Sequence, residues 1–215
     1  MLPNNIIHKA GEVYSIIKEN EPVPGCTISE MVYNDAYHIT NFSLAKGTSI
    51  SAESYPHNTL YIILSGDVMM NDQHLTSMDA LITPKNELYG LKAIENTIYT
   101  EINLKETIMN NLTPGQIFSL KNILPFKEGK IVNMDIVDEE KMKFVVMSFD
   151  AGCSLPEHAA PGQALIFALE GEGIIGYEGQ EYPLKEGENF VFAPGGMHYV
   201  KAEKPFKMAL LLLLK

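Results

Sequence analysis

The sequence predicts an all-β protein built from two similar domains, and three observations support this prediction. Short runs rich in Ile, Val, Leu, Phe and Tyr alternate with clusters of Gly, Pro, Asn and Asp about every ten residues, the spacing of an all-β barrel or sandwich. The two halves of the chain can be aligned with each other. Segments with helical periodicity are short and few, so helices do not define the fold.

The internal repeat joins residues 47–66 to residues 152–171. The first segment reads GTSISAESYPHNTLYIILSG and the second GCSLPEHAAPGQALIFALEG, and they align without a gap at an offset of 105 residues. The glycines at both ends of the two segments coincide. Residues 89–104 fall on residues 198–213 after the offset grows by four. We expect this four-residue insertion to lie in a hairpin.

Individual strands are expected where apolar runs are bounded by turn residues. The clearest are residues 59–64, 143–149, 164–169 and 190–192. Hairpin loops are predicted at residues 71–72, 177–180 and 185–188. The run MALLLLL at residues 208–214 is too short to cross a bilayer and is typical of the last buried strand of a core. Weak helical signals cover residues 11–20 and 106–111.

A polar segment between the repeats, KETIMNNLTPG, marks the predicted domain boundary. We therefore expect a first domain over residues 1–104, a linker over residues 105–117 and a second domain over residues 118–215.

The composition is that of an ordinary globular protein and excludes a nucleic-acid-binding role. Of the 215 residues, 46% are hydrophobic and 20% charged, which excludes disorder for the bulk of the chain. The net charge is −11 and the sequence contains no Arg, so both the basic surface and the bidentate side chain that nucleic acids require are missing. A ligand held by an Arg clamp is excluded for the same reason.

The cysteines and the N-terminal residues predict a cytoplasmic protein. Cys26 and Cys153 lie far apart in the sequence, a pattern that fits a reducing compartment better than a disulfide. No basic start is followed by an apolar stretch of signal-peptide length, and no run approaches the length of a membrane span.

The order of glycine, proline and histidine in the second half resembles the two motifs of the cupin superfamily. Gly152 is followed by His158 and Gly171, and later by the segment GENFVFAPGGMH, which ends at His198. The resemblance is strong for residues 118–215 and faint for residues 25–104. It implies two tandem double-stranded β-helix barrels of jelly-roll type. We expect these barrels to pack face to face or to form a homodimer through strand exchange at sheet edges. The resemblance leaves the function open because cupins have many functions.

Two of the four metal ligands that the resemblance implies are absent from the second half. The family has a second His and a Glu where this sequence has Ala160 and Ala164. His158 and His198 remain as the candidate ligands of one divalent transition metal, Zn, Ni, Fe, Mn or Cu, which two imidazoles alone would hold weakly. Gln163 is the candidate for a third ligand through its amide oxygen, although alternation along a strand would turn it away from Ala164.

Three interpretations of the histidine pair stay open. His158 and His198 could hold a metal completed by water or a small ligand. They could act without metal as hydrogen-bonding or acid-base groups in the barrel mouth. They could also make structural hydrogen bonds only.

The first half retains no recognised metal set. The alignment places Glu53, Tyr55, Thr59 and Tyr89 at the four ligand positions, and His57 lies close to Glu53 in sequence. We therefore expect no cofactor in the first domain and interpret it as a structural partner.

These observations predict a small-molecule-binding protein with a weak metal site in its second domain. His158, Gln163 and His198 are the predicted ligand-binding residues. The alternative is a metal-dependent enzyme, a dioxygenase or isomerase, whose substrate supplies the missing metal ligands. The sequence contains no dinucleotide-binding glycine motif, no phosphate-binding loop and no serine nucleophile elbow.

Overall fold

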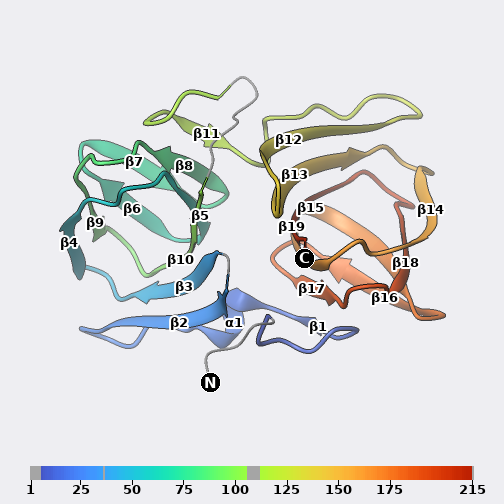
Figure 1. Cartoon of the computed structure of the whole chain (residues 1–215), viewed down its shortest axis with the longest axis horizontal. Coiled ribbons are helices and arrows are strands. Elements are labelled where there is room, and N and C mark those ends of the chain that lie inside the picture. Colours follow the sequence, from blue (N-terminus) through green and yellow to red (C-terminus); the bar gives the residue numbers. More distant parts are fainter. Residues whose placement is uncertain (1–5, 36, 106–111, 215) are drawn as a thin grey trace. The chain divides into compact units, whose positions relative to one another are not determined.

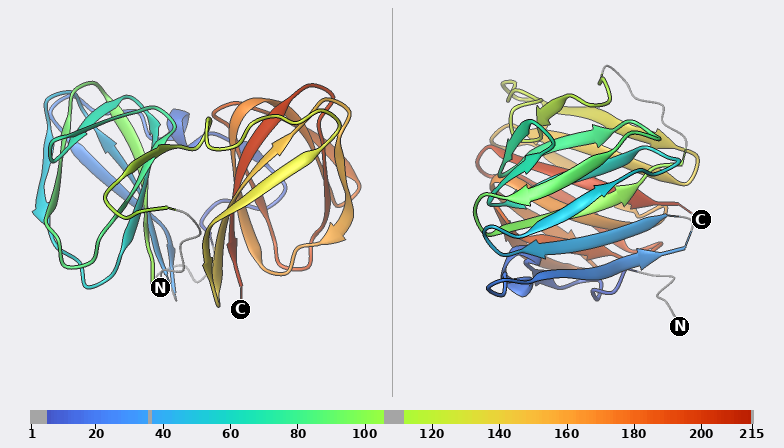
Figure 2. Two further views of the ribbon diagram at one scale, coloured as in Figure 1. Left: turned by 90° about the horizontal axis from the view of Figure 1, so that it is seen from above. Right: turned by 90° about the vertical axis from the view of Figure 1, so that its left-hand side faces the viewer.

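The computed structural model describes residues 6–35, 37–105 and 112–214. The chain forms two compact units, and the strands of each wrap around a core of their own (Figures 1 and 2). The described helix, α1 (Ile16–Glu19), is a single turn, shorter than the weak pattern over residues 11–20 suggested. The helical turn predicted at residues 106–111 lies outside the described residues.

The first unit consists of a six-stranded and a four-stranded antiparallel sheet. The larger sheet has the order β11-β8-β5-β10-β3-β2 and the smaller one β4-β9-β6-β7. The strands are β2 (Thr27–Asn34), β3 (His38–Leu44), β4 (Ser49–Glu53), β5 (Thr59–Ser65), β6 (Asp67–Met70), β7 (Gln73–Thr76), β8 (Asp79–Thr83), β9 (Tyr89–Ala93), β10 (Thr97–Asn103) and β11 (Ile117–Ser119).

The second unit is built on a nine-stranded sheet whose main path is β1-β17-β15-β19-β13-β12, with β14, β16 and β18 joined at the side through β15 and β18. The apolar run near the C-terminus forms the central strand β19, between β15 and β13, as predicted. The strands are β1 (Val13–Tyr14), β12 (Ile131–Glu139), β13 (Met142–Phe149), β14 (Ser154–Ala159), β15 (Gln163–Tyr177), β16 (Gln180–Lys185), β17 (Asn189–Phe192), β18 (Met197–Lys201) and β19 (Phe206–Leu213).

Two short strands do not pair with the strand that comes next in the sequence, and each belongs to the other unit. β1 precedes β2 but pairs with β17, and β11 precedes β12 but pairs with β8. Among the described residues, the first unit therefore comprises residues 6–7, 17–105 and 112–119, and the second comprises residues 8–16 and 120–214. Residues 8–16 thus group with the second unit and not with residues 17–104, because strand pairing over two or three residues leaves no periodic signal in the sequence.

The internal repeat is present in the backbone. Gly66 and Gly171 both have a positive φ, of 93° and 78°. A Cβ on Gly66 would lie 2.1 Å from the carbonyl oxygen of Asn96, and one on Gly171 would lie 2.3 Å from that of Pro205. Asn96 and Pro205 are themselves equivalent in the sequence alignment. Equivalent glycines therefore lie equally close to equivalent backbone carbonyls in both units.

The four-residue insertion lies in a hairpin, as the alignment predicted. In the first unit β6 and β7 are four residues each, joined at Asn71 and Asp72. The equivalent hairpin of the second unit pairs residues 172–177 with residues 180–185. Each strand of this hairpin is longer by two residues.

The remaining sequence-based expectations for the fold agree with the structure. The predicted strands 59–64, 143–149, 164–169 and 190–192 lie within β5, β13, β15 and β17. Cys26 and Cys153 are both free. Within the described part of the chain, no helix has the length and apolar character needed to cross a membrane.

Candidate functional site

The two predicted metal ligands of the second unit face each other. His158 lies on β14 and His198 on β18, and the two residues are directly paired across the antiparallel ladder. Their ring centroids are 4.2 Å apart with an interplanar angle of 52°. Two strand positions 40 residues apart in sequence thus bring both imidazoles to one place.

Both imidazoles hydrogen-bond to a backbone carbonyl two residues earlier in the chain. Nδ1 of His158 lies 2.9 Å from the oxygen of Pro156, and Nδ1 of His198 lies 3.1 Å from that of Gly196. A carbonyl can only accept, so Nδ1 carries the proton in each ring and Nε2 of the neutral ring keeps its lone pair. The backbone thus fixes the tautomer in which Nε2 can bind a metal or accept a hydrogen bond.

The two histidines differ in burial. His158 is exposed, whereas His198 is 7% exposed and its ring stacks on Phe192 at a centroid distance of 4.0 Å. Burial lowers the pKa of His198, and repulsion from His158 lowers it further, against the opposing effect of the Gly196 carbonyl. His198 is therefore neutral at pH 7.

An aromatic cluster forms the floor beneath the pair. Phe192 packs against Tyr177 at 5.5 Å and against Phe190 at 5.4 Å between ring centroids. A Cβ on Gly196 would lie 2.5 Å from the Tyr177 ring, so glycine is required there for the strand to approach this cluster. The pair thus presents two nitrogen acceptors on an apolar base.

Within residues 6–35, 37–105 and 112–214, the structure adds no His, Cys, Asp or Glu as a third ligand to the pair. Ala160 and Ala164 are buried, and Ala164 belongs to the core cluster that contains Phe192. Gln163 lies next to Ala164 in the regular part of β15, so its side chain is on the opposite face of the strand and is not brought to the pair. No group of three or more His, Cys, Asp or Glu side chains suited to a metal occurs among the described residues. The donor set fits only a weakly held metal.

In the first unit, some of the residues that the alignment placed at the four metal-ligand positions lie close together. The hydroxyl of Tyr55 donates to Glu53 at 2.6 Å, and Tyr89 is paired with Glu53 across β4 and β9. Thr59 is fully buried. The ring of His57 lies 5.5 Å from that of Tyr55.

Sequence reasoning missed three residues of the same region, Tyr61, Tyr99 and Glu101. Glu101 and Tyr99 lie on β10 and Tyr61 on β5. The available signal was the alternation in TIYTEIN, which places the charged Glu101 on the same face of β10 as Tyr99. These residues do not stand at the ligand positions of the family, so the resemblance gives no indication of them.

Comparison with known proteins identifies the fold of both halves. Residues 145–214 match the family model for the cupin domain. A cupin 2 conserved barrel domain protein from Leptotrichia buccalis is 28% identical with a TM-score of 0.86, over 97% of this chain and 99% of that one. No curated protein has a significant match to this sequence.

Two more distant structures share the fold alone. The protein Ylba from E. coli has a TM-score of 0.62 at 13% identity, over 98% of this chain and 94% of its own. A variant of salicylate 1,2-dioxygenase from Pseudoaminobacter salicylatoxidans has a TM-score of 0.59 at 13% identity, over 81% of this chain and 69% of its own. Residues 145–214 therefore match the cupin domain, and the chain as a whole has the fold of cupin proteins.

Proposed function

We propose that the second unit binds a small molecule at the His158–His198 pair. The observation that supports this most is the pair of Nε2 lone pairs, held side by side by backbone hydrogen bonds above an aromatic floor. Small-molecule sites commonly combine a mostly apolar lining with a few convergent polar groups. The exposed His158 gives a ligand access, while Phe192 excludes water from beneath His198.

A divalent transition metal belongs to this proposal as a weak component. His158 and His198 would hold it through Nε2, and the bound small molecule would fill its remaining positions. Such a metal would supply Lewis acidity to an oxygen of the ligand. The chain's own contribution is to keep Nδ1 of each ring protonated and His198 neutral, so that both Nε2 atoms are free to bind.

A metal-dependent enzyme would require more metal ligands than His158 and His198 provide. Oxygen chemistry in cupin-like sites relies on a fuller set, such as two histidines and one carboxylate. Ala160 and Ala164 occupy the positions from which the missing ligands would come. We therefore favour binding over catalysis.

The experiment is elemental analysis and Co²⁺ titration of protein purified without chelator or nickel resin. The His158→Ala, His198→Ala double variant is compared with wild type, and His74→Ala, an exposed histidine of the first unit, is the control. Metal that is present in wild type and His74→Ala and lost in the double variant supports the proposal. Equal Co²⁺ binding in all three proteins would place the metal elsewhere, and no binding in any of them would remove the metal from the proposal.

A further inference from the structure

The inner face of the first unit carries a column of polar side chains. Tyr61 on β5 and Tyr99 on β10 are part of the core of this unit. Glu101 lies directly opposite Tyr61 in a regular part of the β5–β10 ladder, so alternation places Glu101 on the same inner face as Tyr99. Thr59 precedes Tyr61 by two residues on β5 and also faces inward. Four polar side chains therefore line neighbouring inner positions.

The opposite wall adds a second carboxylate and a third phenol. Glu53 ends β4, which lies in the smaller sheet, and the hydroxyl of Tyr55 donates to it at 2.6 Å. The charge of Glu53 acts on Glu101, and the Tyr61 hydroxyl hydrogen-bonds the Glu101 carboxyl. Both Glu53 and Glu101 also raise the pKa of Tyr99. We call these residues, Glu53, Tyr55, Thr59, Tyr61, Tyr99 and Glu101, the polar cluster.

Two buried hydroxyls of the polar cluster have no hydrogen-bond partner among the described residues. Tyr99 and Thr59 are each 0% exposed, and neither the Tyr99 hydroxyl nor the Thr59 Oγ1 is hydrogen-bonded. Nε2 of His57, next to the cluster, is also buried without a partner. An unpaired buried polar group costs about 1–3 kcal/mol, and most such groups in folded proteins are satisfied. These atoms therefore indicate a polar occupant.

The polar cluster has no positive countercharge within the described part of the chain. Burial raises the pKa of Glu101 to about 7, and the negative charge of Glu53 contributes in the same direction. Burial is the first cause of the raised pKa of Tyr55, Tyr61 and Tyr99 as well, and no described cation opposes these shifts. The polar cluster is thus acidic and aromatic, and it contains more hydrogen-bond acceptors than donors.

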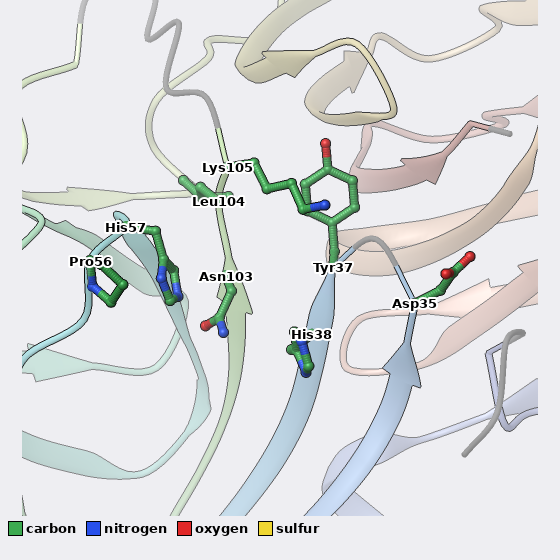
Figure 3. A pocket seen from close by; sticks show the side chains of 8 residues that line it. All are labelled: Asp35, Tyr37, His38, Pro56, His57, Asn103, Leu104 and Lys105. Atoms are coloured by element: carbon green, nitrogen blue, oxygen red, sulfur yellow. The ribbon is translucent and has the colours of Figure 1, made fainter. Parts of the chain in front are cut away.

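A cavity of about 400 Å³ lies beyond the end of the column (Figure 3). Asn103, the next inner position after Glu101 on β10, lines it together with His38 and His57. Asp35, Tyr37 and Lys105 also line it, and the Lys105 amino group is 5.6 Å from the centre of the Tyr37 ring. This cavity is large enough for the body of a small ligand whose end reaches the polar cluster.

We propose that the first unit binds a small organic cation, a primary ammonium group, in the polar cluster, with the rest of the ligand in the adjoining cavity. An ammonium has three N–H donors. The carboxylates of Glu53 and Glu101 accept two of them, and the orphaned Tyr99 or Thr59 hydroxyl accepts the third. The rings of the buried Tyr61 and Tyr99 add cation-π attraction on the inner side of the site, whereas Glu53 is exposed and lies on its solvent side. This site is separate from the histidine pair of the second unit.

An inorganic divalent cation matches the polar cluster less well. Hard divalent cations prefer six or more oxygen ligands, mostly carboxylates, carbonyls and waters. The cluster offers two carboxylates, one of which is partly protonated at neutral pH, and its remaining oxygens belong to neutral phenols and a threonine. Aromatic faces stabilise an organic cation and contribute nothing to metal coordination.

The test uses three probes of equal length and different charge: n-butylammonium, 1-butanol and butyrate. Binding is followed on the full chain by isothermal titration calorimetry at pH 8 and by chemical-shift changes in the tyrosine ring signals. We expect n-butylammonium to bind at least about tenfold more tightly than 1-butanol, because only the ammonium pairs its charge with the carboxylates. Butyrate should not bind, because a third negative charge beside two carboxylates is strongly disfavoured.

Three variants assign the binding to the polar cluster. Glu101→Gln keeps the shape and should weaken n-butylammonium binding about tenfold or more. Tyr99→Phe removes only the orphaned hydroxyl and should weaken binding severalfold without lowering the melting temperature of the free protein. Glu95→Gln, which removes the same charge from an exposed position paired with Lys46 in the same unit, is the matched control and should leave the affinity unchanged.

A second readout is the proton balance. Because a cation stabilises the ionised form of Glu101, binding at pH 6.5 should release a fraction of a proton, visible as a dependence of the binding enthalpy on the buffer, and Glu101→Gln should abolish it. Binding of butyrate as tight as that of n-butylammonium, or full affinity in Glu101→Gln, would overturn the proposal. Stoichiometric Mg²⁺ or Mn²⁺ binding that Glu101→Gln abolishes, with no n-butylammonium binding, would replace it with a metal site.

Discussion

The carboxyl of Glu101 lies directly opposite Tyr61 across the β5–β10 ladder and accepts a hydrogen bond from its hydroxyl. This places an ionisable acid on the inner face of a β-sheet, where apolar side chains are the rule. The hydrogen bond to Tyr61 favours the ionised form, but burial and the charge of Glu53 favour the neutral form more strongly. The ionisation of Glu101 is therefore linked to the stability of the fold.

We predict that the free energy of unfolding falls as the pH rises through the range from 4.5 to 7 because of Glu101. Its pKa of about 7 in the folded chain lies above the ordinary value of 4.5, so the folded state binds the proton more tightly than the unfolded state. The contribution that favours folding is thus complete below about pH 4.5 and is lost as the pH approaches 7. Urea denaturation at pH 5 and pH 8 measures the effect.

The variant Glu101→Gln should remove this dependence. It cannot ionise, so its stability relative to wild type should be greater at pH 8 than at pH 5, by roughly 1–2 kcal/mol after allowance for partial exposure. The groups that face Glu101 are Glu53, Tyr55, Tyr61 and Tyr99, and the tyrosines remain neutral throughout this range. A difference that is the same at both pH values would show that Glu101 titrates normally.

His198 makes the free energy of unfolding depend on pH in the opposite direction to Glu101. Because the pKa of His198 is lowered in the folded chain, the unfolded state binds its proton more tightly, and stability is lost as the pH falls below about 6.5. Between pH 7.5 and pH 5.5 we expect the melting temperature of wild type to fall relative to that of His198→Gln, a comparison in which the opposite contribution of Glu101 cancels because both proteins contain it. His38→Gln, an exposed histidine in the first unit, should follow wild type. Equal pH profiles for all three proteins would contradict the effect of burial on His198.

The glycines of the repeat test the close backbone approach. Gly66→Ala should destabilise the chain by about 3 kcal/mol or more, because the substitution adds a methyl group 2.1 Å from the Asn96 carbonyl oxygen and strains a positive φ. Gly47→Ala is the matched control, since Gly47 has a similar φ of 82° with open space around its Cβ position. It should cost about 1 kcal/mol. Urea denaturation compares the two, and equal losses would mean that backbone strain alone explains the conserved geometry of the repeat.

Sequence patterns predicted the features that depend on local order or on the internal repeat. The equivalence of Gly66 and Gly171 and the hairpin insertion follow from turn residues and self-alignment, and the buried strand β19 follows from its continuous apolar run. The resemblance to the cupin motifs predicted that His158 and His198 belong together, and their direct pairing across β14 and β18 agrees.

The polar cluster could not be predicted in the same way. Glu53 and Glu101 lie on strands of different sheets, so their proximity arises from closure of the fold and not from spacing along the chain. The grouping of residues 8–16 with the second unit is also non-local, because it rests on a two-residue strand and on the Ser15 hydroxyl, which donates to the Gly187 carbonyl at 2.9 Å.

A buried lysine provides the last prediction. Lys207 is 6% exposed, and its amino group lies 2.9 Å from Glu170, donates to the Lys121 carbonyl at 2.7 Å and sits 4.3 Å from the centre of the Phe126 ring. Glu170 is only partly buried, with 34% of its side chain exposed, so solvent reduces the cost of leaving its charge without a partner. Lys207→Met should therefore destabilise the chain by about 1–3 kcal/mol in urea denaturation.

Two further variants separate the causes of this loss. Lys201→Met removes an exposed lysine paired with Glu203 and should cost less than about 1 kcal/mol. If the loss in Lys207→Met arises mainly from the stranded charge of Glu170, adding Glu170→Gln should recover part of it, and the two substitutions should not be additive. The other outcome is a loss of stability in the double variant equal to the sum of the losses in the two single variants. In that case the contacts of Lys207 with the Lys121 carbonyl and the Phe126 ring dominate, and Lys207 stabilises the segment before β12 within the second unit.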